Sequence, residues 1–302
     1  MEIHQQSIRM GHQSGIYDLC MNGAEQFLSV AGDGWIVQWN FREEDGSLIS
    51  KVDGQLFSVA FDSQRKRIWT GDMNGGVYII DESTRQLLYK VKRHQKGTYA
   101  IEVVGDHVLT LGGEGAFSVW DPEAMAPLHT FQLSAAHLRA IAVHPKRPIM
   151  ALAGGEGHIF IVDTEQWNWV QTIEEAHDSS IFDLCFHPTT SALMSGGRDA
   201  MIRSWDWETG VLKKEVPAHL FTVNTLAVSP DQKWLLSGSR DKSFKLWRAE
   251  DLKLQKVVDV TKESYHMNSV NKVLWPKSDL LVTASDDRTI RLWKWSDSTR
   301  NH

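Results

Sequence analysis

Residues 177–205 read HDSSIFDLCFHPTTSALMSGGRDAMIRSW, and this stretch decides the fold. It contains short apolar runs, separated by segments rich in Gly, Pro, Asp and Ser. Short runs with β-branched and aromatic side chains between turn formers predict strands. A further run, VLKKEV at 211–216, follows before the next His, so the stretch predicts a unit of four short strands.

The same unit recurs seven times along the 302-residue chain. A fixed position near the end of each copy, spaced by 41, 40, 42, 43, 42 and 46 residues, holds Trp39, Ile80, Trp120, Val162, Trp205, Trp247 and Trp293. Six positions earlier stand the turn residues Asp33, Asn74, Glu114, Glu156, Asp199, Asp241 and Asp287. No stretch shows a convincing helical period, so the repeat predicts an all-β architecture made of like units.

The order and spacing of His, Ser or Thr, Asp and Trp in these copies resemble the WD-repeat (WD40) family. The pattern is clearest at His177, Ser195, Asp199 and Trp205, and it covers essentially the whole chain. The resemblance implies one domain over residues 1–302, a seven-bladed β-propeller whose four-stranded antiparallel blades surround a central channel. The seventh copy lacks its outermost strand, so we expect residues 3–10 to pair with the last blade and close the ring.

The family pattern joins the His, hydroxyl, acidic and Trp side chains of a blade by hydrogen bonds, which satisfies buried polar groups. The matching positions are His12, Ser29, Asp33 and Trp39; His94, Thr110 and Trp120, with Glu114 replacing Asp; His177, Ser195, Asp199 and Trp205; His219, Ser237, Asp241 and Trp247; and His266, Thr283, Asp287 and Trp293. A structural role is expected, because the His–Asp–Ser trio recurs in several blades and one hydrolytic site needs it once.

The second and fourth copies depart from this pattern, since Ile80 and Val162 replace Trp and no His stands in register. We expect packing alone to hold these two blades. In the fourth copy, Trp167 and Trp169 alternate on an expected outer strand, which places both on the same side of it.

The resemblance also implies that partners bind on one face of the ring, around the channel mouth. The corresponding strand positions are Tyr17, Phe57, Tyr99, Arg139, Phe182, Asn224 and Asn271, and the positions before the turn residue include Arg198, Arg240 and Asp286. Aromatic residues and Arg dominate interface energetics. We therefore expect a peptide to lay apolar side chains on Tyr17, Phe57 and Tyr99 while an acidic group pairs with the arginines. The alternative is that these aromatic side chains merely narrow the channel.

Composition excludes several classes of protein. The formal net charge of −6 argues against a surface built to neutralise phosphates, so nucleic acid is an unlikely partner. The chain has no apolar run of about 18 residues that would span a membrane. Cys20 and Cys185 fall in distant copies and form no disulfide framework, and the two GGEG segments fall on repeat turns rather than in a phosphate loop. We expect no catalytic residue, cofactor or metal, and a cytoplasmic, monomeric protein.

The leading interpretation is a non-enzymatic scaffold that binds a peptide or protein segment on one face of the propeller. One alternative is a propeller enzyme acting on a small molecule at the channel mouth. A second alternative is an RNA-associated assembly factor, since Arg139, Arg198 and Arg240 come from neighbouring copies.

Overall fold

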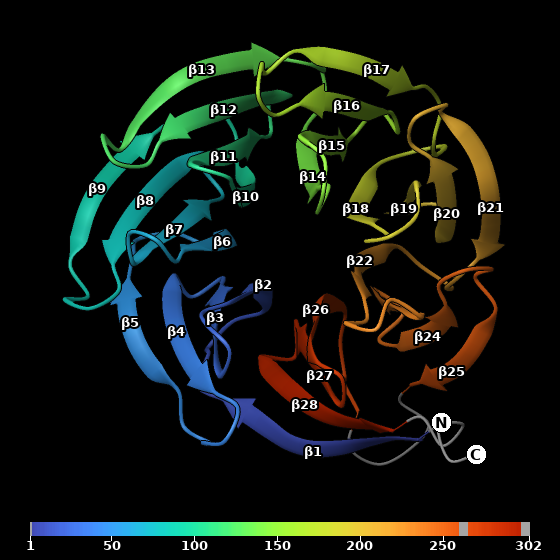
Figure 1. The fold of residues 1–302 in the computed structure, drawn as a ribbon. Helices are drawn as coiled ribbons and strands as arrows, with labels where there is room; N and C mark the ends of the chain where they lie inside the picture. Colours follow the sequence, from blue (N-terminus) through green and yellow to red (C-terminus); the bar gives the residue numbers. More distant parts are fainter. Residues whose placement is uncertain (1, 260–264, 297–302) are drawn as a thin grey trace.

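Twenty-eight β-strands form seven four-stranded antiparallel sheets around a central channel in the computed structural model of the chain (Figure 1). The structure describes residues 2–259 and 265–296. Within these two ranges every regular element is a strand, and no helix is present that could cross a membrane. The predicted all-β, seven-bladed propeller is confirmed.

Strands run from the channel outward within each blade. The first three blades comprise β2 (Ile16–Met21), β3 (Gln26–Ala31), β4 (Trp35–Asn40) and β5 (Ser47–Lys51); β6 (Leu56–Asp62), β7 (Arg67–Asp72), β8 (Gly76–Asp81) and β9 (Leu87–Lys92); and β10 (Thr98–Val104), β11 (His107–Gly112), β12 (Ala116–Asp121) and β13 (Ala126–Gln132).

The next three blades follow the same order. They comprise β14 (Leu138–Val143), β15 (Ile149–Gly154), β16 (Ile159–Asp163) and β17 (Trp169–Ile173); β18 (Ile181–Phe186), β19 (Ala192–Gly197), β20 (Met201–Asp206) and β21 (Val211–Pro217); and β22 (Val223–Val228), β23 (Trp234–Ser239), β24 (Phe244–Arg248) and β25 (Leu254–Val258).

The last blade joins the two ends of the described chain. Its strands β26 (Val270–Lys277), β27 (Leu280–Ser285) and β28 (Thr289–Ser296) are completed by the N-terminal β1 (Glu2–Met10), which lies along the outer edge of β28 (Figure 1). The pairing is antiparallel, with Ile3 opposite Trp295 and Met10 opposite Thr289. The expected closure is confirmed, and it gives β28 a partner strand where it would otherwise expose an edge.

The core lies between neighbouring blades rather than inside any one of them. Phe27 and Trp39 of blade 1, for example, pack with Val282 and Leu292 of blade 7 in one buried cluster. The middle strands are covered on both faces, which explains continuous apolar runs such as VYII in β8. Each blade therefore depends on its neighbours for burial of apolar surface, and the closed ring supplies that burial to all seven.

The prediction that packing alone holds blades 2 and 4 was wrong. In blade 2 the Tyr78 hydroxyl donates a hydrogen bond of 2.8 Å to Asp72 Oδ2. In blade 4 the Ser134 hydroxyl donates one of 2.7 Å to Glu156 Oε2. Ser134 stands four residues before Leu138, which is the position that His177 has relative to Ile181. Blade 4 thus keeps a loop-to-turn hydrogen bond made by a different side chain, whereas in blade 2 the bond joins β8 to the end of β7.

Trp167 and Trp169 do not share a strand as expected, although both side chains line one pocket beside Phe131. Trp169 begins β17 and is 61% exposed, whereas Trp167 lies in the preceding turn with a φ of 56° and is buried against blade 3. The left-handed backbone of Trp167 itself breaks the strand alternation on which that expectation rested.

Candidate functional site

The top face is defined here as the face that carries the loops entering each inner strand and the turns between the second and third strands of each blade. One residue on each inner strand is the extra residue of a β-bulge beside this face. In β2, Ile16 pairs with Ala31 and Asp18 pairs with Val30, which leaves Tyr17 unpaired. The same register shift occurs in all seven blades, at Tyr17, Phe57, Tyr99, Arg139, Phe182, Asn224 and Asn271.

A bulge re-aims the side chain of its extra residue, and these seven side chains line the mouth of a cavity of about 450 Å³ in the channel. The family resemblance, applied in the repeat register, predicted all seven as mouth positions, and the structure brings them together. Each is half-buried, so part of each side chain faces the open channel.

The aromatic residues form a continuous arc across neighbouring blades. Tyr17 meets Phe57 edge-on with ring centroids 5.0 Å apart, and Phe57 lies 5.7 Å from Tyr99. The Arg139 guanidinium then stacks over Phe182 at 3.7 Å from the ring centroid. These contacts are each worth about 1 kcal/mol, so the arc is held rigidly before any partner arrives.

The rest of the mouth is polar and held by side-chain hydrogen bonds. Asn224 Nδ2 donates to Ser269 Oγ at 2.8 Å, and Ser269 Oγ donates to Asn271 Oδ1 at 2.9 Å. Asn271 Nδ2 donates to Asp286 Oδ1 at 2.7 Å. Burial and the nearby Asp286 carboxylate raise the pKa of Tyr17, so its phenol stays a neutral hydrogen-bonding group. The mouth thus has an apolar arc opposite an amide and carboxylate arc.

The two other arginines lie apart from this cavity. Arg139 lines it, whereas Arg198 and Arg240 stand on exposed turns outside the cavity lining. Asp286, by contrast, belongs to the lining. The three arginines therefore do not form one cluster. Only Arg139 lies inside the mouth, and the other two stand beside it.

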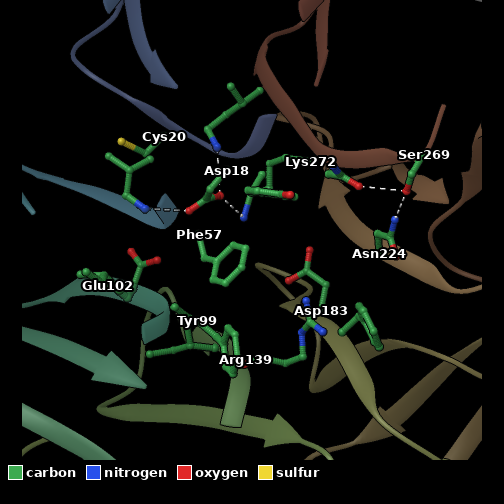
Figure 2. Close-up of a pocket in the computed structure, with 18 of the residues that line it drawn as sticks. Asp18, Cys20, Phe57, Tyr99, Glu102, Arg139, Asp183, Asn224, Ser269 and Lys272 are labelled. Carbon is green, nitrogen blue, oxygen red and sulfur yellow. Dashed lines mark hydrogen bonds and ion pairs between the residues drawn. The ribbon is translucent and has the colours of Figure 1, made fainter. Parts of the chain in front are cut away.

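Below the mouth lies a charged ring that the sequence analysis missed. Figure 2 shows Asp18, Glu102 and Asp183 projecting into the channel from three blades, with Lys272 beside Asp18. Lys272 Nζ lies 3.0 Å from Asp18 Oδ1. Asp18, Asp183 and Lys272 each follow a mouth residue directly, so extending the repeat alignment by one position would have found three of the four.

Two of these carboxylates join neighbouring blades. Asp18 Oδ2 accepts a hydrogen bond of 2.9 Å from Val59 N in β6, and Asp183 Oδ2 accepts one of 2.7 Å from Leu226 N in β22. Each carboxylate thereby satisfies a backbone donor of the next blade's inner strand. Their role in the structure is to connect inner strands around the channel.

Crowding in the channel shifts the protonation of this ring. Channel water reaches Glu102, yet protein surrounds it closely, and this desolvation raises the pKa of Glu102 to about 7, with Asp18 adding to the rise. Burial likewise raises the pKa of Asp183. Asp18 and the other carboxylates raise the pKa of Lys272 against the effect of its burial, so the ammonium stays charged. Within the described residues, no group of three or more His, Cys, Asp and Glu side chains is placed to hold a metal ion.

The loops above the mouth are fixed by five hydrogen-bonded sets. In blade 6, His219 Nδ1 lies 2.9 Å from Asp241 Oδ2, His219 Nε2 lies 2.8 Å from Ser237 Oγ, and Trp247 Nε1 donates to Ser237 Oγ at 2.8 Å. Equivalent sets join His12, Ser29, Asp33 and Trp39; His94, Thr110, Glu114 and Trp120; His177, Ser195, Asp199 and Trp205; and His266, Thr283, Asp287 and Trp293.

These sets also shift the protonation of their members. Burial lowers the pKa of His219 and of His266, even though each has a carboxylate partner. Hydrogen bonds from His219 and from Leu220 N hold the pKa of Asp241 far below its usual range, despite its burial. In blades 6 and 7 the top-face loop therefore rests on a neutral imidazole and an ionised carboxylate near neutral pH.

Comparison with known proteins gives both family and fold matches. A family model described as "WD domain, G-beta repeat" matches residues 4–40, 167–206, 210–248 and 260–294, half of the chain in all. The chain is 33% identical over 139 residues to the "Nuclear distribution protein nudF" of Aspergillus niger, an alignment that covers 42% of this chain and 29% of that protein. It is 36% identical over 120 residues to the "Nuclear distribution protein nudF 1" of Talaromyces marneffei, covering 39% and 26%.

The matched region spans less than a third of these relatives' length. Among solved structures, the WD40 beta propeller domain of Doa1 superposes with a TM-score of 0.85 over 98% of both chains at 17% identity. That likeness supports the fold described above.

Proposed function

Because this chain belongs to the WD40 repeat family, we propose that it is a non-enzymatic scaffold whose top face binds a peptide or protein segment over the channel mouth. The observation that carries the proposal is the β-bulge present on all seven inner strands, which turns one side chain per blade toward the mouth. Strand pairing does not require these side chains, and four of them are aromatic.

The form of the mouth indicates how such a segment would bind. Its apolar side chains would pack on the arc of Tyr17, Phe57 and Tyr99, and its polar backbone would face the amides of Asn224 and Asn271. The arc is held by ring contacts before binding, which reduces the ordering cost of association. A partner carboxylate would reach Arg198 or Arg240 at the edge of the mouth.

The channel carboxylates support a structural role rather than catalysis. Asp18 and Asp183 accept backbone hydrogen bonds from neighbouring blades, and Asp18 is also paired with Lys272. The two cysteines have free thiols, in keeping with a reducing, cytoplasmic location.

Site-specific photocrosslinking tests the binding face. A p-benzoylphenylalanine introduced at Tyr99 should crosslink a protein partner in an extract of the source cells. The same probe at Lys66, which is exposed in the turn between β6 and β7 on the opposite face, is the control and should not. Equal crosslinking from both positions, or from Lys66 alone, would refute top-face binding. If the aromatic arc merely narrows the channel, Tyr99 yields no crosslink.

A further inference from the structure

Large apolar side chains are exposed on the top face of blades 6 and 7. In each of these blades the residue after the repeat His donates its backbone N–H to the turn carboxylate: Leu220 N to Asp241 at 3.0 Å, and Met267 N to Asp287 at 2.9 Å. Blades 1 and 3 make the same bond from Gln13 and Gln95, at 2.7 and 3.2 Å.

The backbone alone performs this structural task, so the side chain is free to vary. Blades 1 and 3 carry a polar Gln at this position, whereas Leu220 is 83% exposed and Met267 is 66% exposed. Phe221, beside Leu220, is 59% exposed. Leaving three large apolar side chains in water has no use in the fold, and adjacent exposed apolar groups mark interaction surfaces.

Basic residues stand in left-handed turns of the same two blades. The position after the turn residue is glycine in blades 1 to 4, as in Gly34 with a φ of 76°, and it is Ala200 with a φ of 65° in blade 5. Blades 6 and 7 place Lys242 and Arg288 there, with φ values of 73° and 69°. A left-handed backbone disfavours residues with a Cβ, so these two cations are kept against local conformational preference.

The turns of blades 6 and 7 expose cations, although their formal charge balances, because Asp241, Asp286 and Asp287 offset Arg240, Lys242 and Arg288. Arg240, Lys242 and Arg288 are exposed and form no ion pair with any residue in the described ranges, while the chain carries a formal net charge of −6. The neighbouring Asp241 and Asp287 are mostly buried against His219 and His266. Three accessible cations thus lie on the top-face turns of the two blades that carry the exposed apolar side chains.

Hydrogen bonds connect the top-face loops of blades 6 and 7. The turn of blade 6 is tied to its loop by Arg240 N donating to Thr222 O at 3.1 Å. That loop leads into Asn224, which donates to Ser269 Oγ in the corresponding loop of blade 7 at 2.8 Å. We name Leu220, Phe221, Arg240, Lys242, Met267 and Arg288 the blade 6–7 surface.

We propose that the blade 6–7 surface docks an acidic segment of a protein partner that also carries apolar side chains. The apolar groups of the segment pack on Leu220, Phe221 and Met267, while its carboxylates pair with Arg240, Lys242 and Arg288. The inference rests on the proposed function in taking the top face as the binding face. Both proposals use Arg240, which the test variant leaves unchanged, and the other residues of the surface lie outside the cavity lining, so they are testable apart from the mouth.

Peptide arrays provide the probe. Each peptide has fifteen residues, of which two are Leu, Phe or Met and the rest are Glu, Ser and Gly. The array varies the spacing between the two apolar residues. Matched control arrays replace every Glu by Gln or by Lys. The test variant combines Leu220→Gln, Met267→Gln, Lys242→Gly and Arg288→Gly, which gives blades 6 and 7 the residues that blades 1 and 3 carry at these positions and relieves the left-handed strain. Met73→Gln and Lys66→Glu are matched controls, because Met73 is an exposed methionine on the top face of blade 2 and Lys66 is a left-handed lysine on the opposite face.

The acidic array should contain the tightest ligands, and the test variant should weaken them at least tenfold while its unfolding midpoint and the two controls stay near wild type. With methyl-labelled methionine, the acidic peptide should shift the Met267 signal and leave Met73 in place. The Tyr99→Ala variant should bind the acidic peptide as the wild type does, because Tyr99 is not part of the blade 6–7 surface. A failure of the mouth proposal is therefore distinguishable from a failure of this one. The proposal is overturned if no acidic peptide binds, if the Gln or Lys array binds equally well, or if the test variant binds as wild type. Binding of a uridine 15-mer that is steep in salt and unchanged by Leu220→Gln would assign the surface to nucleic acid instead and likewise overturn it.

Discussion

Lys272 Nζ lies 3.0 Å from Asp18 Oδ1, which links the inner strand of the last blade to that of the first across the point where the ring closes. The same Asp18 carboxylate accepts the backbone N–H of Val59 in the second blade. A single side chain thus connects three consecutive inner strands, and the cation of Lys272 balances one of the three channel carboxylates.

Removing that cation should destabilise the fold. Lys272→Met leaves Asp18 without its ion-pair partner, and Arg139 near Asp183 is then the remaining cation of the cavity lining. We expect a loss of about 2 kcal/mol in the free energy of unfolding at pH 7.5, measured with urea. Lys277→Met on the same strand is the control, because Lys277 pairs with Glu25 at the surface and should cost less than about 1 kcal/mol. An equal loss of unfolding free energy in the two variants would show that the channel ion pair stabilises the fold no more than a surface ion pair does.

Glu102 should make stability depend on pH. Its pKa is raised from 4.5 to about 7 in the folded protein, so ionisation is easier in the unfolded chain, and the free energy of unfolding falls as the pH rises from 4.5 to 7. Glu102→Gln removes this loss. The variant should therefore be more stable than wild type at pH 8, by no more than about 1 kcal/mol because channel water screens the charge, and should match it at pH 4.5. Exposed Glu43→Gln should show no such pH-dependent gain, and a less stable Glu102→Gln at pH 8 would refute the shift.

The hydrogen-bonded set of blade 6 should be measurable by deleting its imidazole. His219→Ala removes the groups that face Asp241 and Ser237 and leaves both partially unsatisfied, which should cost about 1–3 kcal/mol in urea unfolding at pH 7.5. His129→Ala, on the exposed outer strand β13, controls for the loss of a histidine and should be near neutral. An unaltered midpoint for His219→Ala would contradict a stabilising role for this set.

Ring closure predicts a large effect from a short deletion. Deleting residues 2–10 removes β1, exposes the edge of β28 and uncovers Trp295, so the melting temperature should fall by about 10 °C or more. Met10→Ser, at the 74% exposed end of β1, should leave the melting temperature within about 2 °C of wild type. If the deletion variant has the same melting temperature as the wild type, the ring is stable without its closing strand.

The sequence predicts the fold and the mouth to a considerable depth because both follow the repeat register. The near-regular spacing from the Trp39 position to Trp293 predicts seven like units, and the family resemblance, aligned on His177, places the mouth residues of each blade. The sequence did not reveal the charged ring in the channel, because that ring depends on contacts between blades. Asp18, Glu102, Asp183 and Lys272 meet only after the ring closes, and their connecting hydrogen bonds follow from bulges that leave no mark in composition.

Substitution within the repeat explains why we did not predict the hydrogen bonds of blades 2 and 4. Ser134 replaces His in blade 4 and still bonds to the turn carboxylate, and Asp72 with Tyr78 supplies a different link in blade 2. A search for the family's His, Ser or Thr, Asp and Trp alone overlooks other side chains that form hydrogen bonds within a blade.

The central claim, partner binding at the channel mouth, is tested most directly by quantitative capture from an extract of the source cells with the Tyr99→Ala, Arg198→Ala variant. We predict that protein partners retained by the wild type are lost from the variant while its melting temperature stays within about 2 °C, since both side chains reach solvent. Retention of the same partners in undiminished amount would contradict the claim.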